Sequence, residues 1–177
     1  VHHKNYSLSY NEEHEQAEWV AYELKKSHLS KSNHKRPYFE VDPAVKTKSA
    51  HWRNYKNSNY DRGHLCPAGD RQFNKAAHDE TFLTSNISPQ RHGFNSGIWN
   101  ALEQKTRYWA RKYDGLFVVT GGVLESNLET IGEEQVTVPN YFYKVLLDYN
   151  SGSPKMIGFL MEHRNSNQAL YHYVVPV

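Results

Sequence analysis

A histidine in a short polar segment is the first residue whose type suits catalysis. His64 ends the run Asp61-Arg62-Gly63-His64. A neutral imidazole, with an ordinary pKa of about 6.5, is the side chain best suited to take a proton from water at neutral pH. If the segment is extended, Arg62 and His64 face the same side, which would place a phosphate-binding guanidinium beside a base. For these four residues alone, a turn with an ordinary histidine is the plainer interpretation.

Three further polar residues, Asn95, Glu103 and Arg107, fall within a predicted helix. Glu103 and Arg107 are four residues apart on its exposed side, so they can pair and fix the arginine for an anionic ligand. A common surface ion pair explains the same spacing. Asn95 stands at the start of the helix, where an N-cap is its simplest role. Mg²⁺ keeps several of its waters, however, so one amide oxygen suffices as its direct protein ligand.

The elements that must position these residues are a mixture of helix and strand. The interval 95–113 predicts a helix, because its apolar residues form a helical stripe and no proline interrupts it. The interval 27–59 has little periodicity and is expected to be a long surface loop, which in a compact domain usually has a function. Alternating or continuous apolar residues predict strands in four places: 6–10, 20–24, 116–120 and a hairpin of 141–149 with 156–161.

Length and composition favour one domain. The chain has 177 residues, a net charge of +2 and a single cysteine, which excludes an internal disulfide and a multi-cysteine zinc site. Buried packing is the expected role of that cysteine, Cys66. Eleven histidines invite a zinc hydrolase, but no His-Glu-x-x-His spacing occurs. No apolar run approaches the roughly 20 residues needed to span a bilayer, and the first residues do not resemble a signal peptide.

The positive charge is concentrated in one part of the chain. Residues 25–62 contain ten Lys or Arg and three acidic residues, a local net charge of +7. A basic segment suits a polyanionic substrate, because neutralising phosphates releases counterions and supplies affinity that does not depend on sequence. A solvated basic loop is the plainer interpretation when the segment is considered alone.

Several motifs in order resemble those of the DNA/RNA non-specific endonuclease family, which belongs to the ββα-metal, or His-Me finger, nucleases. The resemblance covers most of the chain. It rests on Asp61-Arg62-Gly63-His64, then Phe82-Leu83-Thr84-Ser85-Asn86-Ile87-Ser88-Pro89-Gln90, Asn95 with Trp99, Leu102-Glu103 and Arg107, and upstream on Lys35-Arg36-Pro37 with Asp42-Pro43. The implied fold is α+β, a ββα-metal finger nuclease with a central, mostly antiparallel sheet flanked by helices.

The resemblance also implies roles for individual residues. His64 would be the general base, Asn95 the metal-binding residue, and Glu103 a residue acting through metal-bound water. Three residues would form the polar shell around the scissile phosphate: Arg62, Asn86 and Arg107. Arg36 would bind substrate. The expected cofactor is Mg²⁺, with Mn²⁺ as a substitute, and the expected reaction is sequence-nonspecific hydrolysis of DNA and RNA to 5′-phosphate and 3′-hydroxyl ends.

Other interpretations stay open at this point. The chain could be a noncatalytic nucleic-acid binding module, or a His-Me finger enzyme that nicks at a defined site. A homodimer and a restraining inhibitor protein are both compatible with the sequence. Because relatives of this type often degrade nucleic acid outside the cell, a secreted or periplasmic location is expected, with work inside an organelle, as in some relatives, as the alternative. Relatives commonly continue past the final strand with a helical segment, so a truncated or naturally short chain is expected.

Overall fold

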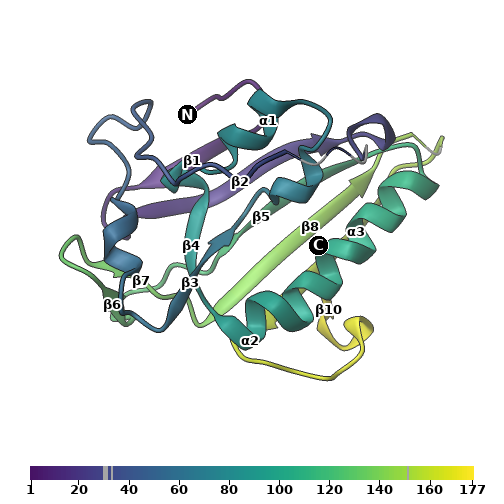
Figure 1. Cartoon of the computed structure of the whole chain (residues 1–177). Coiled ribbons are helices and arrows are strands. Elements are labelled where there is room, and N and C mark those ends of the chain that lie inside the picture. The colour runs from purple at the N-terminus through teal and green to yellow at the C-terminus, as the bar shows by residue number, and fades with distance from the viewer. Residues whose placement is uncertain (30–31, 33, 151) are drawn as a thin grey trace.

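The strands of the protein come together in one large antiparallel sheet. The computed structural model describes residues 1–29, 32, 34–150 and 152–177. The sheet has six strands in the order β1-β2-β5-β8-β9-β10 (Figure 1). Their bounds are Ser7–Asn11 for β1, Gln16–Leu24 for β2, Leu116–Gly122 for β5, Tyr141–Asp148 for β8, Lys155–Glu162 for β9 and Val174–Val175 for β10. All four strand regions predicted from apolar patterning are therefore confirmed.

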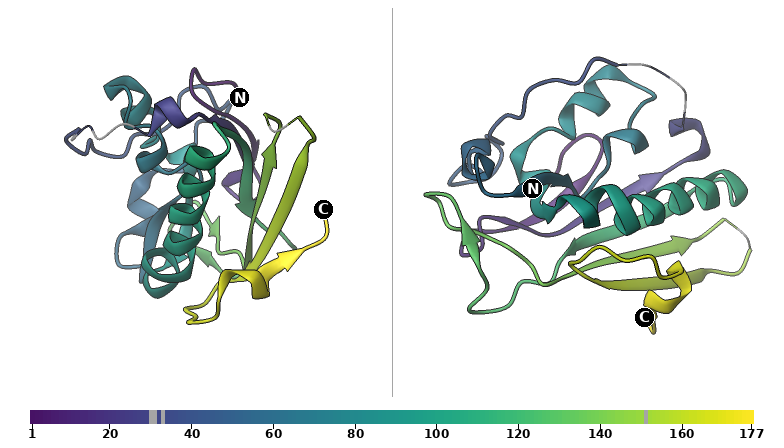
Figure 2. Two further views of the ribbon diagram at one scale, coloured as in Figure 1. Left: turned by 90° about the vertical axis from the view of Figure 1, so that its right-hand side faces the viewer. Right: turned by 60° about the horizontal axis from the view of Figure 1, so that its bottom comes forward.

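The helices lie together on one face of this sheet. The long helix α3, Asn100–Lys112, runs along the sheet, and the short helix α1, Lys75–Glu80, lies on the same side (Figures 1 and 2). A continuous helical path leads into α3 through α2, His92–Phe94, and the π-helix η5, Asn95–Trp99. Single 3-10 turns complete the described helices: η1 Lys26–His28, η2 Trp52–Tyr55, η3 Ala68–Asp70, η4 Thr84–Asn86 and η6 Leu170–Tyr173.

The main core fills the space between α3 and the sheet. Strand β8 alternates strictly, and its buried positions include Phe142 and Leu146. These pack with Trp99 and Leu102 of the helical segment, where the apolar stripe predicted from the sequence faces inward. The opposite face of the sheet carries exposed apolar side chains, which include Phe117, Met156 and Leu160.

The longest excursion of the chain from the sheet lies between two neighbouring strands. β2 and β5 are hydrogen-bonded partners, and Leu24 at the end of β2 pairs with Leu116 at the start of β5. Residues 25–115 therefore leave the sheet at the end of β2 and return to it at the start of the neighbouring strand β5. They include the two-stranded sheet of β3, Tyr60–His64, and β4, Ile87–Arg91. Every residue singled out above for catalysis or substrate binding lies in this excursion.

The predicted loop over 27–59 is mostly irregular, as expected, and residues 30, 31 and 33 of it lie outside the described part. Its second half is tied down, because Glu40 forms a parallel bridge with Leu83. Asp42 is buried and accepts hydrogen bonds from His3 at 2.8 Å and from Ser85 at 2.5 Å. The remaining two strands, β6 Thr130–Ile131 and β7 Val136–Thr137, form a small hairpin beside η2.

Candidate active site

Two short strands and the helix that follows them make the frame of the site. β3 and β4 pair antiparallel, with His64 opposite Ile87 and Arg62 opposite Pro89. The chain passes directly from β4 into α2, η5 and α3. The order strand, strand, helix is the ββα arrangement. Because β3 is extended, Arg62 and His64 point to one side, as the sequence predicts.

His64 lies in an aromatic pocket. Its ring is 4.9 Å from that of Phe82, edge to face, and 5.6 Å from that of Phe39. Its Nε2 atom is buried and has no hydrogen-bond partner among the described residues. Burial, followed by the charges of Arg36 and His78, lowers the pKa of His64 to about 3. The imidazole is therefore neutral at physiological pH, which is the form a general base requires.

Two arginines lie against the Phe39 ring, which also contacts this histidine. The guanidinium carbon of Arg36 lies 5.6 Å from the centre of the Phe39 ring and 5.2 Å from that of Phe82. That of Arg62 lies 4.9 Å from the Phe39 ring. Stacking on aromatic faces holds a guanidinium in place without using its N–H donors. The loop and strand β3 thus bring Arg36, Arg62 and His64 together, as the sequence predicts.

Asn95 is set within a helix and not at its start. Its backbone is helical, with φ −58° and ψ −50°, and the helical path begins before it at His92. The N-cap role considered from the sequence is therefore wrong. Its Nδ2 instead donates to Asp61 Oδ2 at 2.9 Å. Asp61 belongs to β3, so this bond ties the helix to the strand that carries His64.

Glu103 and Arg107 form the predicted pair, but in a sheltered position. Arg107 Nη2 lies 3.4 Å from Glu103 Oε2, and the two side chains are only 11% and 14% exposed. The expectation that they line the exposed side of the helix is wrong, because Gly69 and Asp70 of η3 lie against Arg107. Burial, offset by the charges of Arg107 and Lys144, raises the pKa of Glu103 to about 7.

Two further charged residues belong to this cluster and are not indicated by any local motif. Asp70, which is 1% exposed, accepts a hydrogen bond from Arg107 Nε at 2.6 Å. Lys144 of β8 is fully buried, and its Nζ lies 4.8 Å from the centre of the Trp99 ring. Burial lowers the pKa of Lys144, while the charges of Glu103 and Asp70 oppose that shift. The sequence signal that could have pointed to Lys144 is a lysine at an inward-facing position of the alternating strand β8.

Asn86 makes contacts of a different kind from those expected. It is fully buried, its Oδ1 accepts from the Cys66 backbone N–H at 2.8 Å, and its Nδ2 donates to the carbonyls of Cys66 and Thr81. These bonds occupy the amide with backbone groups and fix the turn after His64. Cys66 is a buried free thiol, so the packing role predicted for it is confirmed.

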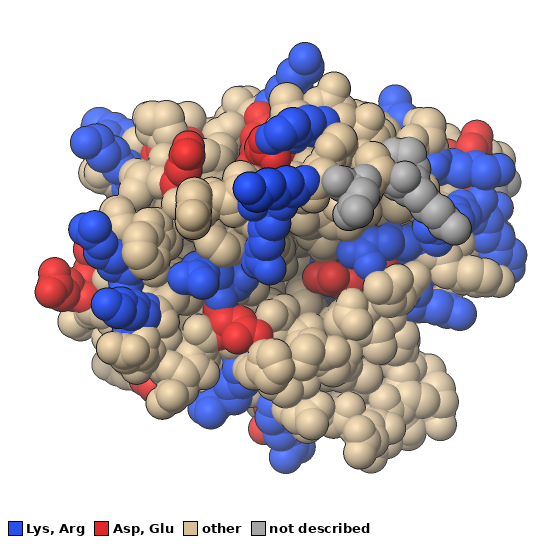
Figure 3. Space-filling view, in the orientation of Figure 1, with Lys and Arg blue, Asp and Glu red and all other residues tan. Residues whose placement is uncertain are grey.

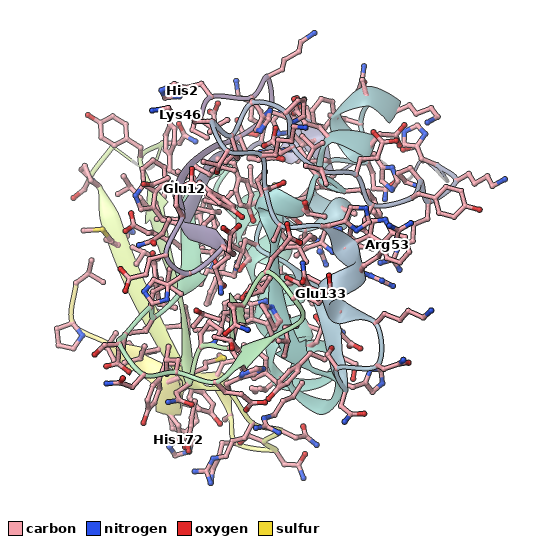
Figure 4. The ribbon with its side chains drawn as sticks, turned by 90° about the vertical axis from the view of Figure 1, so that its left-hand side faces the viewer. His2, Glu12, Lys46, Arg53, Glu133 and His172 are labelled. Carbon is pink, nitrogen blue, oxygen red and sulfur yellow. The ribbon has the colours of Figure 1, made fainter. Side chains whose placement is uncertain are left out.

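Around the site the surface is rich in Lys and Arg. Figure 3 shows basic side chains over the upper part of this face and both basic and acidic side chains around a hollow near its centre. Another groove, between η2 and the β6–β7 hairpin, has both Arg53 and Glu133 in its lining (Figure 4), and this mixed charge suits a polyanion less well. None of the described helices has the length and apolar character that crossing a bilayer requires.

The whole chain, residues 1–177, matches the family model described as DNA/RNA non-specific endonuclease. The chain belongs to this family. Its α+β fold, with a ββα frame on one face of an antiparallel sheet, is therefore the one expected of a DNA/RNA non-specific endonuclease. A solved structure agrees. The chain superimposes on EndoG from a crystal structure of the EndoG/EndoGI complex with a TM-score of 0.91 and 29% identity, covering 99% of this chain and 79% of that one.

Curated members of the family are similar in sequence. The chain is 36% identical over 155 residues to the mitochondrial nuclease EXOG of Danio rerio, which covers 81% of this chain and 45% of that protein. It is 30% identical over 189 residues to the mitochondrial endonuclease G of Homo sapiens, covering 98% and 64%. The chain thus spans less than two thirds of the length of these relatives. Their names correct the secreted or periplasmic location expected from the sequence, because both are called mitochondrial.

Proposed function

We propose that this chain is a metal-dependent endonuclease that hydrolyses the phosphodiester bonds of DNA and RNA without regard to sequence. The observation that carries the proposal is the convergence of a neutral histidine, two aromatic-stacked arginines and an oriented asparagine on one ββα frame. Contacts of this kind address phosphates, which every nucleotide carries, and not base edges.

In the proposed reaction His64 removes a proton from a water molecule. The water oxygen bonds to phosphorus as the bond from phosphorus to the 3′ oxygen breaks, and the 3′ oxygen takes up a proton from solvent ordered by Glu103. Arg36 and Arg62 hold the substrate phosphates, and Arg107 neutralises charge that develops on the phosphoryl oxygens. Asn86 keeps the turn after His64 in place. The products carry 5′-phosphate and 3′-hydroxyl ends.

Asn95 suits a hard divalent cation. Because an ionised carboxylate can only accept hydrogen bonds, the Asn95 amide nitrogen must face Asp61, which leaves Oδ1 as the atom for a metal. Among the described residues no group of three or more His, Cys, Asp or Glu could hold a metal ion, so the protein would supply few ligands, as Mg²⁺ accepts. Bound Mg²⁺ would act as a Lewis acid on the phosphoryl oxygens, and Mn²⁺ is the expected substitute.

The test is digestion of supercoiled DNA and of RNA. We expect progressive degradation of both with Mg²⁺ and none with EDTA. His64→Ala should lower the rate by about 10²- to 10⁴-fold, the usual contribution of a general base. The matched control is His172→Ala, because His172 is an exposed histidine on η6 (Figure 4), and this variant should cleave at the rate of the wild type.

Other results would point elsewhere. Binding and cleavage that are both unchanged in His64→Ala would refute the proposed base, and a protein that binds nucleic acid but never cleaves it would be a binding module. A single defined cut in plasmid DNA would indicate a site-specific nicking enzyme. We also propose that the chain is one domain that forms a homodimer and binds an inhibitor protein. The inhibitor protein is suggested by the EndoG structure, which contains EndoGI. Light scattering tests the homodimer.

A further inference from the structure

Arg107 is held in place by the carboxylate of Asp70, which belongs to none of the catalytic motifs. Its Nε donates to Asp70 Oδ1 at 2.6 Å, across 37 residues of sequence. Its Nη2 reaches Glu103 at 3.4 Å. Among the residues that the structure describes, Nη1 makes no hydrogen bond. Two of the three guanidinium nitrogens therefore face the protein, and one is left for an outside oxygen.

The second oxygen of Asp70 is also engaged. Tyr22 of β2 donates its hydroxyl to Asp70 Oδ2 at 2.8 Å, and both side chains are buried. The hydroxyl has no alternative polar partner among the described residues. A chain of hydrogen bonds thus runs from the central sheet through Tyr22 and Asp70 to Arg107. Because Tyr22 is a rigid ring on a packed strand, it fixes the carboxylate that in turn fixes the guanidinium.

The backbone at η3 is shaped for the same contact. A Cβ atom added to Gly69 would lie 2.7 Å from Arg107 Nη2 and 3.0 Å from its Cζ. A side chain at this position would press on the guanidinium at the point where Asp70 and Glu103 hold it. Gly69 lies between Pro67 and Asp70, so the short turn that delivers the carboxylate also leaves space for the arginine.

Two carboxylates so near each other need cations on both sides. Asp70 and Glu103 flank Arg107, and Lys144 of β8 is buried nearby, with no hydrogen-bond partner for its Nζ among the described residues. Charges in a buried cluster are tolerated when each has a partner of opposite sign. The contact between Arg107 and Asp70 lies within this cluster and is made by the protein alone.

We propose that Asp70 and Tyr22 are positioning residues that preorganise Arg107 for a phosphoryl oxygen. The proposal rests on the proposed nuclease function for its catalytic consequence. An arginine side chain has many rotamers, and ordering them during the reaction would raise the barrier. The hydrogen-bonded chain from Tyr22 through Asp70 to Arg107, called the relay below, orders the guanidinium in the free enzyme. It leaves Nη1 for the substrate.

The experiment is a double-mutant cycle on kcat/KM. Tyr22→Phe deletes only the hydroxyl, and we expect it to lower kcat/KM by about tenfold, since a hydrogen bond to a charged group is lost. In an Arg107→Ala background the same substitution should have little further effect, because its target is gone. Gly69→Ala, which crowds the guanidinium directly, should resemble Tyr22→Phe.

The matched control is Tyr6→Phe. Tyr6 is also a buried tyrosine of the N-terminal part, and its hydroxyl donates to the Glu80 carbonyl at 2.9 Å. Both tyrosine variants should lose similar stability on chemical denaturation, and only Tyr22→Phe should lose kcat/KM. An equal loss in Tyr6→Phe, or a full tenfold loss from Tyr22→Phe in the Arg107→Ala background, would overturn the proposal.

A readout without cleavage separates this proposal from the nuclease function. In the NMR spectrum the Arg107 Nε–H proton should exchange slowly with water in the wild type, because Asp70 accepts it, and faster in Tyr22→Phe. If the wild type cleaves no nucleic acid while this difference is seen, the proposed function fails and the relay stands. If cleavage is normal and exchange is unchanged in Tyr22→Phe, the relay fails.

Discussion

Gly63 lies between Arg62 and His64, and its missing side chain makes room for Gln90. A Cβ atom at position 63 would lie 2.2 Å from Gln90 Cδ, and Gln90 is fully buried. Gly63→Ala should therefore destabilise the fold by about 1–3 kcal/mol, as overpacking does. Urea denaturation measures this change, and plasmid cleavage should fall with it because β3 must shift.

A second substitution tests whether this contact is the cause. The three atoms nearest to the added Cβ all lie beyond the Cβ of Gln90, so Gln90→Ala removes them. Gly63→Ala combined with Gln90→Ala should be no less stable than Gln90→Ala alone. If the penalty of Gly63→Ala persists in full in the double variant, the crowding explanation is incorrect.

Asn95 is the single residue on which metal binding is expected to depend. Asn95→Ala removes the oriented Oδ1 atom, so the Mg²⁺ concentration for half-maximal cleavage should rise at least about tenfold. Titration of the cleavage rate with Mg²⁺ and calorimetry of metal binding both report this. Ser96→Ala is the neighbouring control, since in the described part of the chain the Ser96 hydroxyl bonds only the His92 carbonyl, four residues earlier on the same helical path. Equal metal affinity in wild type and Asn95→Ala would exclude the assignment.

At the scale of elements, one histidine joins the end of β4 to the segment before β8. His163 Nε2 accepts from the Arg91 backbone N–H at 2.7 Å, and its Nδ1 donates to the Pro139 carbonyl at 2.8 Å. These partners require the neutral ring, because a protonated Nε2 would face another N–H. Burial is the main reason that the pKa of His163 falls to about 4. These two hydrogen bonds fix the end of β4 at Arg91, where the chain enters the helical segment that contains Asn95.

This join predicts a loss of stability in mild acid. As pH falls below about 6.5, the unfolded chain takes up a proton that folded His163 refuses, so unfolding becomes easier until about pH 4. Over this pH range the free energy of unfolding falls by about 3 kcal/mol. Unfolding free energies of wild type and His163→Gln, measured between pH 7 and pH 4, should diverge by this amount. Parallel curves would show that the folded histidine titrates normally.

Periodicity predicted the elements better than their details. Strands β2, β5, β8 and β9 follow from alternating or bounded apolar runs, and the helical stripe of α3 faces the core as expected. The π-helix was not predictable, because no residue pattern marks a wider turn; within it Gly97 adopts φ −97° and ψ −112°. For the same reason the sequence favours an N-cap as the simplest local role of Asn95, which lies inside a helical segment.

At the scale of the molecule, charge should govern how substrate binds. The basic residues of 25–62 and those around the site suit phosphates, so affinity should depend steeply on salt. For about six phosphate contacts, raising NaCl from 50 to 200 mM should weaken DNA binding about 10³-fold. Fluorescence anisotropy with EDTA present measures this. Cleavage of a small chromogenic phosphodiester with one charge is the control, and a flat salt response for DNA would argue against a phosphate track.

The candidate site was predictable where motifs are local and not where partners are distant. His64, Arg62 and Arg36 all lie beside the Phe39 ring, and Asn95 is tied to the strand of His64 through Asp61; each belongs to a recognisable run of residues. Arg107 bonds to Asp70, and Asp70 to Tyr22, although these residues are far apart in the sequence and meet only in the folded chain. Sequence spacing contains no signal for such contacts.

The pairing of Leu24 with Leu116 also bears on how the protein is made. Everything between these residues is closed into a loop at its base, and a longer loop costs little in equilibrium stability. It does cost time, because non-local strand pairing slows folding. On the ribosome His64, Asn95 and Glu103 are all synthesised before the strand that closes the loop. A chain that stopped short of Leu116 would contain each of them and still lack the sheet on which they are arranged.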